Sequence, residues 1–122
     1  RGAVVRCALE SLAMRYRWVL ERMERCLGRK FARIHIVGGG SQNALLNQMA
    51  ADATGLPVVA GPSECTAVGN ILAQAVARGA LASHAELRQV VAASFPTREF
   101  APGNKAAWDE RYNDFLRMLE RE

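Results

Sequence analysis

Hydrophobic positions recur every three or four residues along the first segment of the chain. Between residues 3 and 27 arginine and glutamate fill many of the positions around an apolar or thiol series formed by Val5, Leu9, Leu12, Tyr16, Val19, Met23 and Cys26. This spacing predicts one long amphipathic helix, which Gly28 ends. The series covers fewer than four heptads and shows no scheme of paired charges, so a coiled coil is the less favoured interpretation.

The pattern then changes to a short β-branched run followed by a second helical series. Residues 32–37 predict a strand, and the three glycines Gly38, Gly39 and Gly40 predict a tight turn directly after it. Ser41 is a suitable N-cap for the helix that follows, which Gly55 ends. The apolar face predicted for that helix consists of Leu45, Leu46, Met49 and Ala53.

The rest of the chain predicts a second strand and three further helices. Residues 56–60 are short and apolar, and Ser63 is expected to cap a helix whose inward face is Val68, Ile71, Leu72, Ala75 and Val76. Residues 83–86 form a capping box for a short helix to about Ala93, and residues 95–102 are expected to be extended. The last helix begins near Asn104, and its predicted face is Trp108, Tyr112, Phe115, Leu116 and Leu119.

The order helix, strand, helix, strand, helix predicts an α/β fold with short parallel strands covered by helices. Two parallel strands leave both sheet edges open, so we expect further strands from chain upstream of this sequence. The sequence opens with Arg1 in a helical pattern without a cap, which favours the interpretation that it is a fragment.

Composition and charge narrow the classes of function. The 122 residues are half hydrophobic with a net charge of +4, which suits one globular domain. Nine basic and three acidic groups lie in residues 1–33. The segment shows neither a recognisable binding motif nor basic residues interleaved with aromatic residues that we expect to be exposed, so we expect no nucleic-acid partner. Three separated cysteines and two histidines predict no metal site, and the absence of a long apolar run predicts a cytoplasmic protein with no membrane partner.

The triple glycine is the segment most able to bind a ligand. A strand that runs through glycines into a helix presents backbone N–H groups and the helix dipole to an anion or a polar ring. The dinucleotide fingerprint fails because Asn43 stands where its third glycine would be, and the Walker A motif fails because no lysine lies between Lys30 and Lys105. A turn that binds nothing is the alternative from the glycines alone.

The run HIVGGGSQNALLNQMAADATGLPVVAGPSECTAVGN, residues 35–70, closely resembles the C-terminal domain of FGGY-family carbohydrate kinases. The resemblance extends more weakly from Ala8 to Phe100. It implies an actin-like ATPase, or ribonuclease H-like, fold, with residues 1–122 forming the C-terminal part of the second, nucleotide-binding domain and the N-terminal domain absent. By the same resemblance, Gly38, Gly39 and Gly40 are the backbone on which ATP packs, and Asn43 offers its amide to the ligand or to the loop.

The resemblance also implies a reaction. It is greatest to members that use ATP and Mg²⁺ to phosphorylate L-rhamnulose at its 1-hydroxyl, and it places the catalytic residues and metal ligands upstream, so that none is expected here. One alternative is a non-catalytic interaction module that docks through its basic first helix. Another is a kinase of the same superfamily with a different sugar or polyol acceptor. The fragment alone is expected to be inactive and to self-associate through apolar surface that the missing chain would cover.

Several other polar or small residues have ordinary structural interpretations. Asp52 and Glu64 are interpreted as helix-stabilising carboxylates rather than as an acid and base pair. His35 is expected to be a packed strand residue, and Cys65 a buried thiol. Gly69 predicts close helix packing or an approach to the binding cleft.

Overall fold

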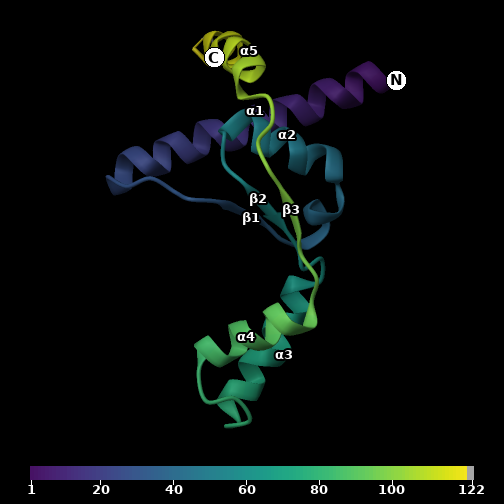
Figure 1. Cartoon of the computed structure of the whole chain (residues 1–122), viewed down its shortest axis with the longest axis vertical. Helices are drawn as coiled ribbons and strands as arrows, with labels where there is room; N and C mark the ends of the chain where they lie inside the picture. Colours follow the sequence, from purple (N-terminus) through teal and green to yellow (C-terminus); the bar gives the residue numbers. More distant parts are fainter. Residues whose placement is uncertain (121–122) are drawn as a thin grey trace.

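The helices and strands follow the predicted order, with one strand added near the end of the chain (Figure 1). The structure is a computed structural model that describes residues 1–120. Its elements are α1 (Gly2–Leu27), β1 (Ile34–Ile36), the 3-10 helix η1 (Gly38–Gln42), α2 (Ala44–Thr54), β2 (Val58–Ala60), α3 (Cys65–Ala77), α4 (His84–Ser94), β3 (Arg98–Phe100) and α5 (Lys105–Leu119). The α/β class is therefore confirmed.

The three strands form one sheet in the order β1-β2-β3. β1 and β2 are parallel, as predicted, with Ile34 opposite Val58. β3 is antiparallel to β2 and places Phe100 opposite Val58. The prediction of an extended segment at residues 95–102 is confirmed, since it contains β3, and this further strand comes from this chain rather than from upstream. A three-residue strand is too short for its alternation to stand out in a sequence.

The core lies on one face of this sheet and between three helices. α2 packs on the sheet through Ala50 and Ala51, which contact Val58 and Phe100. A second cluster joins α1, α2 and α5 through Ala13, Met14, Met49, Ala53, Trp108, Tyr112 and Phe115. The predicted inward face of the last helix is thus confirmed, and α2 is held between the sheet and two other helices.

The apolar series predicted for the first helix is not its buried face. Val5, Leu12, Val19 and Met23 are 41–59% exposed, whereas the buried residues of α1 are Ala13 and Met14. α2 and α5 pack beside this series, on the side of α1 that carries Ala13 and Met14. The exposure of the series agrees with the expectation of apolar surface that further chain would cover. A continuous apolar surface therefore remains open along α1.

A polar network joins α1 to α5 at the edge of the core. The Tyr112 hydroxyl donates to Glu21 Oε2 at 2.9 Å, and the Arg17 guanidinium lies 4.1 Å from the centre of the Tyr112 ring. Arg17 also pairs with Glu21 at 2.9 Å and with Asp109 at 2.6 Å. Burial and the bond to Glu21 raise the pKa of Tyr112 to about 12, so the neutral phenol is the form that this interface stabilises.

Helices α3 and α4 form a hairpin that projects from the sheet on the side opposite α5 (Figure 1). Within these two fully described helices no residue is fully buried, but four of the five residues predicted to face inward are half-buried: Val68, Leu72, Ala75 and Val76. The prediction is wrong for Ile71, which is 67% exposed. Ser63 is not the cap either, because α3 begins after Glu64 without a side-chain cap. The capping box of α4 is confirmed, since Ser83 Oγ accepts from the Glu86 amide at 3.2 Å.

Candidate functional site

The three glycines form the start of a short helix at the carboxyl end of β1. The predicted tight turn is a 3-10 helix, η1, that leads almost directly into α2. Gly38 alone of the three has a left-handed backbone, with φ of +76°. Its amide donates to the Pro62 carbonyl at 2.9 Å, which ties the turn to the segment between β2 and α3. Only Gly38 therefore needs glycine for its backbone conformation.

Gly39 and Gly40 need a different explanation, because both are exposed without left-handed angles. A Cβ on Gly39 would have no other described atom within 4 Å, and one on Gly40 would touch only Ile36 Cγ2 at 3.5 Å. The fold itself would thus accept a side chain at Gly39. The missing side chain leaves bare backbone on the surface, where a flat or anionic ligand could approach it closely.

The N-cap of α2 is Asn43 rather than Ser41. Ser41 is not the N-cap, because its hydroxyl donates back to the Gly38 carbonyl at 2.7 Å within η1. Asn43 is the N-cap of α2, and its Oδ1 accepts from the Leu46 amide at 3.0 Å. Since Oδ1 belongs to the helix, the Nδ2 hydrogens of Asn43 are the atoms with which it could meet a ligand.

Sequence reasoning missed Asn47, one turn further along α2. Among residues 1–120 it is the one polar side chain that is fully buried. Its Nδ2 donates to the Ser41 carbonyl at 2.9 Å, so a residue inside the core holds the end of the glycine turn. The available signal was an asparagine at the inward spacing of a helix whose other inward residues are leucine, methionine and alanine.

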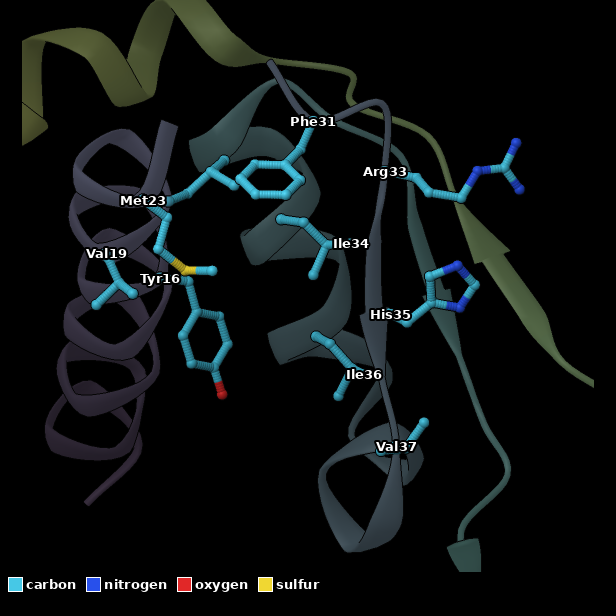
Figure 2. Close-up of a pocket in the computed structure, with 10 residues that line it drawn as sticks. Tyr16, Val19, Met23, Phe31, Arg33, Ile34, His35, Ile36 and Val37 are labelled. Carbon is cyan, nitrogen blue, oxygen red and sulfur yellow. The ribbon is translucent and has the colours of Figure 1, made fainter. Parts of the chain in front are cut away.

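A groove of about 550 Å³ lies between α1 and β1, next to the glycine turn. Figure 2 shows Tyr16, Met23, Phe31, Ile34 and Ile36 turned toward it, while Arg33 and His35 point away to the other face of the strand. The lining ends at Val37, one residue before the turn. A groove with so apolar a wall suits hydrophobic side chains better than phosphates.

Three of the remaining candidates are Asp52, Glu64 and Cys65. Asp52 Oδ1 accepts from the Gly103 amide at 2.7 Å and from Gln48 Nε2 at 3.0 Å, so it fastens α2 to the chain before α5. Glu64 is the residue before α3, and Cys65 is half-buried, with its Sγ 4.0 Å from the place of a Cβ on Gly38. The structural interpretation of Asp52 is therefore confirmed, and Cys65 is less buried than predicted.

Two candidates lie in more open positions than the sequence suggested. His35 is exposed, and the prediction that it packs is wrong because its face of the sheet has no helix over it in residues 1–120. Gly69 has open space where a Cβ would be, so close packing at Gly69 is wrong for the part of the chain described here.

The described residues hold neither a carboxylate cluster nor a membrane helix. Within residues 1–120 no three histidine, cysteine, aspartate or glutamate side chains are grouped so that they could hold a metal ion. In the same range, none of the helices combines the length and hydrophobicity that crossing a bilayer requires.

Comparison with known proteins gives one consistent family. The C-terminal domain of the FGGY family of carbohydrate kinases matches residues 1–78. A rhamnulokinase of Bacteroides thetaiotaomicron is 49% identical over 94% of this chain and 24% of its own length, and one of Yersinia pestis is 39% identical over 96% and 24%. A rhamnulokinase of Mannheimia succiniciproducens is 44% identical over 80% and 20%. The chain thus spans about a quarter of the length of these relatives.

Proposed function

This chain belongs to the FGGY family of carbohydrate kinases, and we propose that it works as the C-terminal, nucleotide-binding part of an enzyme that transfers the γ-phosphate of ATP to L-rhamnulose. The product would be L-rhamnulose 1-phosphate. The observation that carries the proposal is the exposed backbone of Gly39 and Gly40 at the carboxyl end of β1, in a chain 49% identical to a rhamnulokinase. Ligands of α/β proteins bind at this end of parallel strands.

The geometry of the turn suits the adenosine end of ATP. Bare backbone at Gly39 and Gly40 allows a planar ring or a ribose to lie against the chain without meeting a Cβ. Asn43 Nδ2 is a donor at the start of α2, where the helix dipole also favours an electron-rich atom. In this proposal the four residues Gly38, Gly39, Gly40 and Asn43 form one wall of the nucleotide site.

The chemical step would depend on other parts of the longer enzyme. In-line phosphoryl transfer needs a base for the acceptor hydroxyl and carboxylates for Mg²⁺, and residues 1–120 contain no suitable cluster. The residues that distinguish L-rhamnulose from another sugar or polyol would also lie outside this chain. We therefore propose that residues 1–122 bind and position the nucleotide while the remaining three quarters of the enzyme supply the acceptor site, the base and the metal ligands.

A chimera tests the proposal directly. This chain would replace the matching C-terminal quarter of the Bacteroides thetaiotaomicron rhamnulokinase, and ADP release would be followed with L-rhamnulose and MgATP. We expect the chimera to turn over within about tenfold of the parent, whereas the parent truncated before that quarter is inactive. A folded chimera that neither binds ATP nor phosphorylates L-rhamnulose would contradict the proposal. A chimera that binds ATP and prefers another sugar would correct the acceptor only.

The chain by itself is the matched control. With one wall of the site present, phosphates remain in water and no closure can exclude solvent, so we expect no turnover. Its dissociation constant for ATP should be no better than about 1 mM, or about 4 kcal/mol. Calorimetric titration and an ADP assay on repurified chain would measure both quantities, and turnover above a buffer blank would show that a catalytic carboxylate had been missed.

A further inference from the structure

Asn47 lies in a position where an asparagine side chain lowers the stability of the fold. Its side chain is fully buried in α2, beside Leu46, Ala50 and Ala51. Only half of its amide is paired, because Nδ2 donates to the Ser41 carbonyl at 2.9 Å while the buried Oδ1 has no donor among the described residues. A buried acceptor without a donor is destabilising, so a leucine of similar volume would suit the core at least as well.

The paired half of the amide acts on the glycine turn alone. Ser41 is the fourth residue of η1, and its carbonyl lies before the first residue of α2. Asn47 therefore connects the rigid, buried side of α2 to the end of the exposed Gly38–Gly40 backbone. The hydrogen bond spans six residues, so it is not one of the regular bonds of the helix.

The glycine segment has few other restraints on its position. Gly39 and Gly40 have no side chains to pack, and both are exposed. At one end the Gly38 amide donates to the Pro62 carbonyl, and inside the turn Ser41 Oγ donates to the Gly38 carbonyl. At the other end the Gly40 carbonyl accepts from the Asn43 amide at 3.2 Å, which is a local backbone bond. The bond from Asn47 is the restraint that comes from the core. Loss of this bond would allow the Ser41 carbonyl to shift, and Gly39 and Gly40 would shift with it.

We infer that Asn47 is a positioning residue for ATP: its buried amide fixes the Ser41 carbonyl and so sets where the Gly39 and Gly40 backbone meets the nucleotide. This inference rests on the proposed function of the turn. It assigns to Asn47 an effect on nucleotide affinity through the backbone, without direct contact with ATP. The unpaired Oδ1 is then the cost of a bond that serves the turn rather than the core.

The test compares two substitutions in the chimeric kinase. Asn47→Leu removes the amide with little change in volume, and Met49→Ala removes buried volume from the side of α2 that faces α1 and α5. We expect Asn47→Leu to raise the KM for ATP about tenfold, with the KM for L-rhamnulose within about twofold and little change in Tm. Met49→Ala should lower Tm by several degrees and leave both KM values unchanged.

Two further measurements make the result decisive. Asn47→Ser, which is smaller and cannot reach the Ser41 carbonyl, carries the same expectation if the leucine variant does not fold. Gly39→Val separates the two proposals, because it should raise the KM for ATP whether or not Asn47 matters. If Gly39→Val does so and both Asn47 variants keep the parental KM while losing Tm, Asn47 is a packing residue and the inference is overturned. If Gly39→Val has no effect either, the proposed function of the turn fails first.

Discussion

The α3–α4 hairpin differs from α1, α2, α5 and the sheet, here called the body, in how far its apolar side chains are buried. In the body, α2 is covered by the sheet on one side and by α1 and α5 on the other, and every buried residue belongs to these elements. In the fully described hairpin no residue is buried, although α3 has no charged residue from Cys65 to Ala77. An uncharged helix with an open surface is typical of a segment that packs against something else.

The glycine turn lies where these two regions meet. Gly38 bonds to Pro62 at the base of the hairpin, whereas Ser41 is held by Asn47 in the core of the body. The stability of the chain should therefore reside in the body, and the hairpin should contribute to the position of the turn through its base alone.

The largest expected difference is in the cost of removing an apolar side chain. Trp108→Ala empties a buried site between α1 and α5 and should lower the free energy of unfolding by about 3–5 kcal/mol. Ile71→Ala in the hairpin removes a side chain that is 67% exposed and should change it by less than about 0.5 kcal/mol. Urea unfolding of the two variants would measure both, and equal costs would contradict the division into two regions.

A smaller loss of stability should appear at high pH, and it should come from Tyr112 in the body. Tyr112 has its pKa raised to about 12 from 10.0, so the unfolded chain loses this proton first. The contribution of the neutral phenol is complete below pH 10 and is lost as the pH rises toward 12, with a maximum of about 2.7 kcal/mol for two pKa units. Urea titrations from pH 9 to 12 should show this loss, and Tyr112→Phe should remove it. A variant with the parental pH dependence would mean that Tyr112 does not titrate in the folded state as described.

The sequence predicted the elements that depend on local chemistry. Gly28 and Gly55 end their helices with left-handed backbones, Ser83 begins α4, and Trp108, Tyr112 and Phe115 face the core. The helix ends depend on interactions within a few residues of the chain, and the buried face of α5 was visible from the spacing of its aromatic residues although its contacts are distant in sequence. The glycine turn was found for the same reason, because three consecutive glycines after a strand are visible without knowledge of the fold.

The errors concern contacts that no local pattern contains. Ile71 has the spacing of an inward residue, but no described segment covers it. Residues 95–102 were predicted to be extended, but the pairing of β3 with β2 was not predicted, because it joins residues about 40 positions apart. Asn47 was missed because its function depends on the Ser41 carbonyl, and the distance between them is fixed only once α2 and η1 are folded. Local signals therefore pointed to the candidate site, whereas the restraints on it required the tertiary structure.

Gly38 and Gly39 are neighbours in the turn but should respond differently to substitution. Gly38→Ala places a Cβ on a left-handed residue and should cost about 1–2 kcal/mol of stability. A Cβ at Gly39 would have no other described atom within 4 Å, so Gly39→Val should leave the stability nearly unchanged and raise the KM of the chimera for ATP about tenfold. Thermal unfolding and steady-state kinetics on the same two proteins would test this. Parental kinetics and stability in Gly39→Val would mean that the exposed backbone is not at the nucleotide.

The smallest expected effect concerns self-association, and it compares the exposed apolar surface of the body with that of the hairpin. The surface of the body combines the exposed series of α1 with a groove of about 550 Å³ and the outer edge of β1, which in the described sheet has β2 on one side only. The hairpin offers Ile71 on a convex helix. A concave apolar surface beside an unpaired strand edge can bury more area and also form backbone hydrogen bonds, so we expect weak association of the isolated chain through the body.

Val19→Lys should weaken this self-association about fivefold, close to 1 kcal/mol, whereas Ile71→Lys should change it less than twofold. Sedimentation velocity over a concentration series would measure both, with Arg88→Lys as a neutral surface control. A strictly monomeric chain would contradict the expected self-association. A larger effect of Ile71→Lys than of Val19→Lys would show that the chain associates through the hairpin.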